Sequence, residues 1–198
     1  TTEQMKEAYE RSNNKEYDAK RIVGFYIPKD KKCYVNVETA QNRKATTIHE
    51  EIHQLSHGIH TDENGEKYER IGIINYDEKG EALNNQLNEG MTEYYAKKIM
   101  GDEYPGDKTI YKHNTIRAER LEALMGEDLM HKAYFGNQPE LMKNEFDRVL
   151  GEGKFEEFSK CCDYAISENP EEVEYWNNEA NRLLEEYEKL KPIADAAR

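Results

Sequence analysis

The residues of this sequence best suited to chemistry are two histidines and a glutamate within one helical turn. His49 and His53 are four positions apart and Glu50 follows the first of them, in the pattern His-Glu-x-x-His. Residues four apart lie on one face of a helix, about one turn of ~5.4 Å from each other, so both imidazoles can reach one metal ion. A glutamate in this position can take a proton from a metal-bound water. The pattern predicts a zinc hydrolase and favours a peptidase.

A catalytic zinc site normally has a third protein ligand besides two histidines. The segment Leu87–Tyr95 contains Glu89 and Glu93, which are four apart and therefore share a helix face. One carboxylate can bind the metal while the other holds a histidine in one tautomer through a hydrogen bond. The alternative interpretation of this pair is an exposed acidic face on an ordinary helix.

The two segments together resemble the gluzincin family of zinc metallopeptidases. In that family a helix downstream of His-Glu-x-x-His carries a glutamate ligand, often after an asparagine and before a small residue, as in Asn88-Glu89-Gly90. A further acidic residue four positions on commonly hydrogen-bonds a zinc histidine. The resemblance implies hydrolysis of peptide bonds by a zinc-activated water. The implied roles are zinc binding by His49, His53 and Glu89, proton transfer by Glu50, and support of a histidine by Glu93.

The resemblance implies two further parts of the site. Extended substrate would add to an edge strand just before the motif helix, and Cys33–Val37 is in that place, although an ordinary hairpin strand is equally consistent with its pattern. The oxyanion formed during hydrolysis needs a donor besides zinc. In gluzincins this donor is a tyrosine or histidine of the helical lobe. The candidates, among which the sequence does not distinguish, are Tyr111, His113, His131 and Tyr134.

His57 and His60 offer a competing ligand set, because four of the six histidines fall within twelve residues. Metzincins use His-Glu-x-x-His-x-x-Gly-x-x-His, but Ser56 and Ile59 occupy the last two of those positions here. We expect His57 to be a cation at a helix C-terminus and His60 to lie in a loop or at the substrate rim. A metzincin-like hydrolase using His60 stays an alternative. So does a non-catalytic zinc-binding or interaction module.

The composition narrows the range of partners. The chain has 198 residues and a formal net charge of −13, whereas nucleic-acid binding needs a basic surface. We therefore expect a peptide or protein substrate and no nucleic acid. No apolar run approaches the ~20 residues that span a membrane. No signal peptide is recognisable, and the location stays open between the cytoplasm and a trimmed secreted or surface domain.

The motif must sit on a short, packed helix. Ile48, Ile52 and Leu55 recur at helical spacing and predict an apolar stripe. Thr46 or Thr47 is the expected N-cap. Gly58 is the expected C-terminal stop.

Other elements surround this helix. A polar helix is expected over 3–20, and a hairpin of strands 21–27 and 33–37 follows it. The stretch 61–85 is an insertion relative to the best-known gluzincins. Within it, 71–74 reads as a strand and 77–80 as a turn.

Past residue 100 the sequence predicts helices to its end, bounded by glycines and prolines. They cover 110–125, 129–135, 139–150, 155–166 and 172–190. Phe155, Phe158 and Cys162 share an apolar stripe, so we expect the Cys162 side chain to be buried.

The expected fold class is α+β, with a small N-terminal sheet or hairpin over the motif helix and a mainly helical C-terminal lobe. We expect a zinc-site subdomain over residues 1–100 and the helical lobe over 101–198, as one compact unit.

Overall fold

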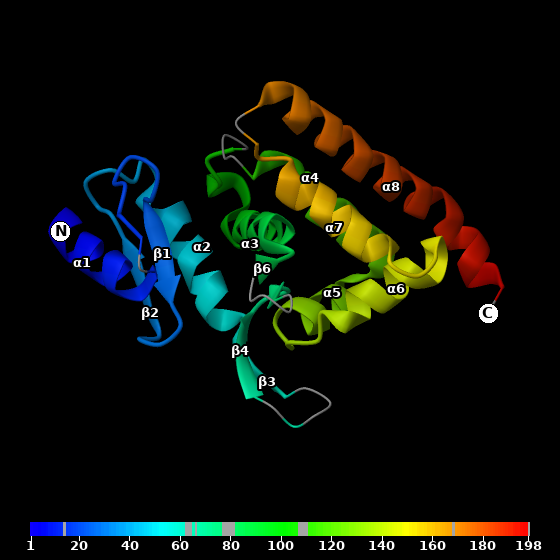
Figure 1. Cartoon of the computed structure of the whole chain (residues 1–198), viewed down its shortest axis with the longest axis horizontal. Coiled ribbons are helices and arrows are strands. Elements are labelled where there is room, and N and C mark those ends of the chain that lie inside the picture. Colours follow the sequence, from blue (N-terminus) through cyan, green and yellow to red (C-terminus); the bar gives the residue numbers. More distant parts are fainter. Residues whose placement is uncertain are drawn as a thin grey trace.

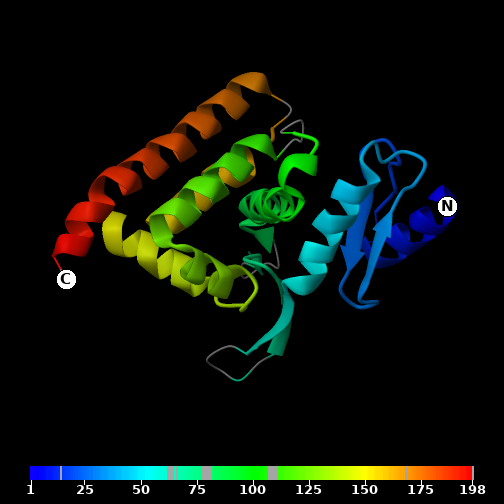
Figure 2. The same ribbon diagram turned by 180° about the vertical axis from the view of Figure 1, so that it is seen from behind.

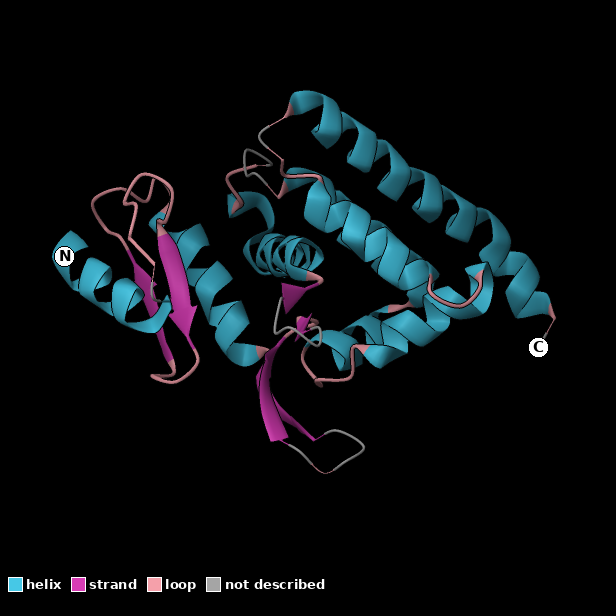
Figure 3. Ribbon diagram, in the orientation of Figure 1, coloured by secondary structure: helices cyan, strands magenta, loops and turns pink. Residues whose placement is uncertain are grey.

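In the part of the chain that the structure describes, three two-stranded antiparallel sheets and a larger set of helices make the protein α+β, as the sequence predicted (Figures 1 and 3). The small N-terminal sheet lies over the motif helix, and the helical lobe follows it. The computed structural model describes residues 1–13, 15–61, 65, 67–76, 82–106, 111–167 and 169–197.

The N-terminal part consists of helix α1 (Thr2–Asn13) and the hairpin of β1 (Gly24–Ile27) and β2 (Lys32–Val35). The hairpin prediction is confirmed, but the helix predicted over 3–20 ends early. Tyr17 explains why, because its buried hydroxyl donates to the Ile22 carbonyl and accepts from the Asn36 side-chain amide, each at 3.0 Å. These contacts fold the chain back toward the hairpin instead of continuing the helix.

The motif helix α2 (Arg43–Leu55) begins earlier than predicted. Asn42, and neither Thr46 nor Thr47, is the N-cap, because its side-chain oxygen accepts a hydrogen bond from Ala45 N at 3.0 Å. An asparagine one turn upstream thus satisfies one of the first free backbone N–H groups of the helix.

The C-terminal end of α2 also differs from the prediction. Ser56 is the C-cap, and Gly58 lies in a strand rather than stopping the helix. The apolar stripe is shorter than expected, since Ile52 is buried but Leu55 is 68% exposed. The helix is therefore held mainly by its second half, where Glu50, Ile52 and His53 are buried, and it packs on the hairpin and on the central helix.

A second hairpin, β3 (His57–Thr61) and β4 (Lys67–Ile71), projects from the body (Figure 1). The strand predicted over 71–74 is wrong beyond Ile71, because Gly72 turns the chain with a φ of 57°. Ile73 is fully buried beyond that turn. Strands β5 (Asn75–Tyr76) and β6 (Ala82–Leu83) form the third sheet. The predicted turn at 77–80 lies outside the described residues.

Helix α3 (Asn85–Met100) lies at the centre of the molecule, between the N-terminal part and the remaining helices (Figure 2). The helices predicted for the C-terminal half are confirmed, the last one being longer than expected. They follow a short 3₁₀ turn, η1 (Gly101–Glu103), and are α4 (Lys112–Met125), α5 (Glu127–Tyr134), α6 (Glu140–Leu150), α7 (Lys154–Tyr164) and α8 (Pro170–Ala196).

One hydrophobic cluster extends from Ile52 of α2 through α3 to Tyr187 of α8. The predicted apolar stripe of α7 joins it, and Cys162 is buried there as expected. Because α3 is surrounded by this cluster, the face that it turns toward α2 is fixed in position. None of the helices among the described residues combines the length and apolar character needed to cross a bilayer.

Candidate metal centre

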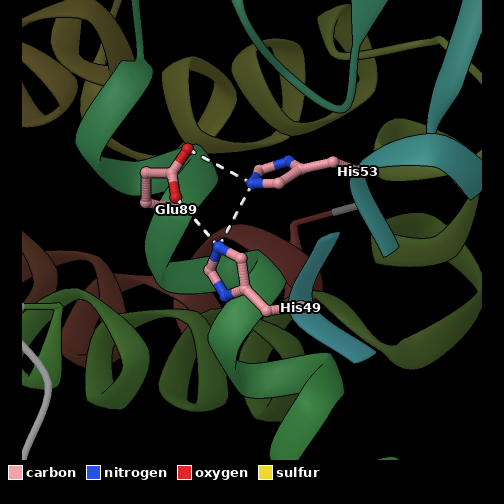
Figure 4. A group of neighbouring side chains, drawn as sticks. All are labelled: His49, His53 and Glu89. Carbon is pink, nitrogen blue, oxygen red and sulfur yellow. Dashed lines mark hydrogen bonds and ion pairs between the residues drawn. The ribbon is translucent and has the colours of Figure 1, made fainter. Parts of the chain in front are cut away.

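Three side chains from α2 and α3 converge on one point, as Figure 4 shows. His49 Nε2 lies 3.1 Å from a Glu89 carboxylate oxygen and 3.2 Å from His53 Nε2. His53 Nε2 lies 3.4 Å from the other Glu89 oxygen. The helical spacing of the two histidines and the central position of α3 produce this convergence.

These spacings fit a metal ion. Ligands in a tetrahedron around zinc at ~2.0–2.1 Å are ~3.3 Å apart, close to the separations between the three side chains. Two imidazoles and one carboxylate are also a donor set of catalytic zinc sites, which leave a fourth position for water. The residues present therefore fit zinc by both donor chemistry and spacing.

Glu93 contacts the ring nitrogen of His49 that faces away from Glu89. Its Oε2 lies 2.8 Å from His49 Nδ1, and the Tyr104 hydroxyl donates to its Oε1. This contact fixes the ring orientation of His49 and leaves Nε2 facing Glu89. Tyr104 was not anticipated from the sequence, where a tyrosine beyond the second helix carries no motif. The Nδ1 atom of His53 has no such partner among the described residues.

The charges of the site depend on one another. Burial alone would lower the pKa of His49, but Glu89 and Glu93 outweigh burial and raise it to about 10. Burial opposes ionisation of Glu89, yet the histidines hold the pKa of this carboxyl far below its ordinary value. The pKa of Glu93 is lowered in the same way by His49 and Tyr104. Without metal, the centre thus holds a protonated imidazole between carboxylates, and a divalent cation would replace that proton.

A cavity of about 640 Å³ opens at the three converging side chains, and Glu50 also lines it. The Glu50 side chain is buried beside the two histidines. Burial raises the pKa of Glu50, although the histidines partly oppose this rise. Gly24 of β1 makes room for the carboxylate, because a Cβ atom at this position would lie 2.7 Å from Glu50 Oε1. This contact could not be predicted from the sequence, since it joins a strand and a helix that are separate in the chain.

Of the four predicted oxyanion donors, only Tyr111 lines the cavity. Its ring stacks on His49, with centroids 6.0 Å apart. Burial, reinforced by nearby carboxylates, raises the pKa of Tyr111 well above its ordinary value, so the hydroxyl keeps its proton.

The structure does not bring the other three donors to the cavity. His113 lines a different cavity, at α8. His131 packs on Tyr95 and lies 3.7 Å from Glu127. Tyr134 is fully buried, and its hydroxyl forms a hydrogen bond with the Thr92 hydroxyl.

The strand that lines the cavity is β1 rather than β2. Gly24, Phe25 and Tyr26 contribute to the wall, whereas Cys33 and the rest of β2 do not. The expectation that Cys33–Val37 edges the site is therefore wrong, because the hairpin turns its first strand toward the histidines.

The competing histidine ligands are not assembled. His57 directly follows the C-cap residue Ser56 of α2, where β3 begins, and its Nδ1 is 2.8 Å from the Tyr26 hydroxyl. His60 lies further along β3 with its ring against Tyr68. Within the described part of the chain, neither histidine joins a group that could hold a metal.

A second group of possible ligands consists of Glu122, Glu127 and His131. Lys98 already neutralises it, because Nζ lies 2.8 Å from Glu122 and 2.9 Å from Glu127. The ammonium group takes the place that a cation would need.

Comparison with known proteins adds no assignment, as no protein-family model, curated protein or solved structure matches this chain.

Proposed function

We propose that the protein is a zinc-dependent peptidase of the gluzincin type, with His49, His53 and Glu89 as zinc ligands. The observation that carries this proposal is the tetrahedral spacing of the three donor groups beside a buried Glu50 in an open cavity. The His₂Glu donor set also suits other divalent metals, including iron, so the identity of the metal belongs to the test.

The chemistry can be divided among the residues. Zinc bound there would lower the pKa of a water to ~7 and polarise the substrate carbonyl. Glu50 takes the proton of the attacking water and delivers it to the leaving amine. Its raised pKa suits both steps, because a base and acid works best with a pKa near the working pH.

Tyr111 is the proposed oxyanion donor. Its hydroxyl stays protonated, and its ring lies against His49, next to the position of the metal. A donor of this kind contributes mainly in the transition state, when charge develops on the carbonyl oxygen.

The free edge of β1 is the proposed binding surface for the substrate backbone. Val23 O accepts a hydrogen bond from Asn36 N at 2.8 Å, so alternate residues beyond it, Phe25 and Ile27, face β2 in the ladder. The backbone groups of Gly24 and Tyr26 then face away from β2. An extended peptide can pair with them along the wall of the cavity.

The test combines metal analysis with peptide cleavage. We expect one zinc per chain, retained in Glu50→Gln and lost in Glu89→Ala. Glu50→Gln should reduce cleavage of a peptide library at least ~10³-fold, because it removes the base but not the metal. Glu51→Gln is the matched control, since this neighbouring side chain is exposed and should leave both zinc and cleavage unchanged.

Three outcomes would contradict the proposal. Zinc that survives Glu89→Ala but is lost in His60→Ala would favour the metzincin-like ligand set. A protein that binds zinc but cleaves no peptide would be a binding module. A protein that takes up no metal would make the helix pair purely structural.

A further inference from the structure

Arg117 of α4 is a buried cation that does not line the cavity of the proposed zinc site. Its side chain is 1% exposed, and its hydrogen-bond partners are oxygen atoms of three asparagines and the Cys162 thiol. The guanidinium donates to Asn114 Oδ1 at 2.7 Å, to Asn181 Oδ1 at 3.1 Å, and to both oxygens of Asn177 at 2.8 and 3.1 Å. These bonds engage all three guanidinium nitrogens but bring no opposite charge to Arg117.

A buried charge is strongly unfavourable unless an opposite charge lies close. None of the ion pairs among the described residues includes Arg117, and burial lowers its pKa. The nearby Cys162 thiol does not supply the opposite charge, because burial raises the pKa of Cys162 to about 12. Within the described ranges, the counter-ion of Arg117 is missing.

A cavity of about 540 Å³ lies next to this guanidinium, between α4 and the first turns of α8, which run side by side (Figure 2). Asn177 and Asn181 line the cavity and also accept hydrogen bonds from Arg117. The side-chain oxygen of Asn181 accepts from Arg117, so the Nδ2 amide group of Asn181 points away from the guanidinium. That amide has no hydrogen-bond partner among the described residues and can donate to a ligand.

Positive charge lies near one wall of the cavity, although the net charge of the chain is −13. His113 lines it, and the pKa of His113 is lowered first by burial and then by the charges of Arg117 and Lys112. Glu174 is the carboxylate of the lining, and it is exposed at the surface.

We propose that the cavity between α4 and α8 binds a small molecule through one carboxylate group, which supplies the missing counter-ion of Arg117. Asn181 Nδ2 and the His113 ring provide direct contacts, and Arg117 acts through the asparagine amides. One buried positive charge matches a monoanion, and Glu174 at the wall would repel a dianion such as phosphate more strongly than a monoanion. This site is independent of the zinc centre.

Acetate is the probe that tests this proposal. At constant ionic strength, we expect acetate to raise the melting temperature saturably, by about 3–5 °C at ten times its Kd, relative to chloride. Asn181→Asp should abolish this shift, because the new carboxylate neutralises Arg117 from within. The matched control is Asn144→Asp on the exposed face of α6, which adds the same charge elsewhere and should keep the shift.

NMR of the His113 ring provides a second measurement that does not depend on stability. Acetate should raise the pKa of His113 by about 0.5 or more, because it offsets the positive charge nearby. The proposal is overturned if acetate gives no saturable change in either measurement, if phosphate alone gives one, or if Asn181→Asp responds to acetate as the unaltered protein does.

Discussion

His49 is the residue on which most of the proposed chemistry depends, because both of its ring nitrogens are engaged. Nδ1 faces Glu93, and Nε2 faces the point where the metal would bind. A proton on Nε2 and a metal ion compete for the same lone pair. The affinity for zinc must therefore depend on pH in a way that the raised pKa of His49 determines.

The first prediction concerns this competition. With a pKa of about 10, metal-free His49 is protonated at neutral pH, so zinc must displace one proton from it. Apparent zinc affinity should rise about tenfold for each pH unit from 7 to 9 and fall as the pH is lowered. Competition titrations at several pH values, and calorimetry in buffers of different ionisation enthalpy, measure the slope and the released proton.

Glu93→Gln serves as the comparison for that prediction. Loss of the carboxylate should lower the pKa of His49, flatten the pH slope and weaken zinc binding about 10–100-fold. Equal affinity and an equal slope in the two proteins would show that Glu93 does not act on His49.

The second prediction concerns Gly24. A Cβ atom there would lie 2.6 Å from Thr46 Cγ2 and 2.7 Å from Glu50 Oε1. Gly24→Ala should displace Glu50 and lower kcat by about 10–100-fold, since misplacement of about 1 Å has effects of this size. Zinc content should not change, because Gly24 touches no proposed ligand.

A second substitution separates this steric effect from general damage. Thr46→Ser removes the Cγ2 atom, so the double variant Gly24→Ala, Thr46→Ser should recover part of kcat. If the double variant is as slow as Gly24→Ala alone, the contact with Thr46 does not position Glu50.

Among the residues of the site, the sequence predicted those that are related by the spacing within one helix. The convergence of His49 with His53, and of Glu89 with Glu93, follows from helical spacing alone. Tyr104 reaches the site through non-local folding, and so does Gly24. No spacing rule identifies residues of that kind.

Among the elements, the approach of α3 to α4 explains the glycine that follows Glu89. A Cβ atom on Gly90 would lie 2.5 Å from the backbone of Asn114. Since this contact is with backbone, a side-chain rotation cannot relieve it. The small residue after Glu89 therefore sets how closely the two helices can pack.

The third prediction uses the sign of a stability change. Helix propensity alone would make Gly90→Ala stabilising by about 1 kcal/mol. The clash should instead make it destabilising by about 1–3 kcal/mol, as overpacked cores are. Urea unfolding of the metal-free protein decides between the two signs, and a stabilised variant would contradict the close packing of α3 on α4.

Periodicity located the helices, but their ends depend on individual caps and on pairing. Helix α2 has its N-cap at Asn42 rather than at a threonine, because the Asn42 side chain makes the capping hydrogen bond and asparagine is the stronger N-cap residue. The residues after Ser56 became a strand because His57 pairs with Ile71 across the hairpin. A glycine such as Gly58 is compatible with a helix stop and with a strand, so only the partner strand decides between them.

For the whole molecule, the sequence predicted the order of the parts but not their contacts. The α+β class and the helical C-terminal half followed from the patterns of apolar residues and glycines. The burial of Arg117 between α4 and α8 did not, because its asparagine partners on α8 are about sixty residues away. Contacts of that separation carry no signal in a single sequence.

The last prediction concerns the coupling of zinc to global stability. Two proposed ligands lie on α2, which carries the N-terminal hairpin, and the third lies on the central helix α3. Zinc binds only when these helices are folded together, so it should stabilise the native state by RT ln(1 + [Zn]/Kd). At free zinc of 100 times Kd this is about 2.7 kcal/mol, or a melting temperature about 5–10 °C higher.

Calorimetry with and without a chelator measures this shift. Glu89→Ala should lose it, because two histidines alone bind zinc weakly, whereas Glu50→Gln should keep it, because Glu50 is not a proposed ligand. A shift that persists in Glu89→Ala would mean that zinc stabilises the fold from another site. The two helices would then owe their packing to the hydrophobic cluster alone.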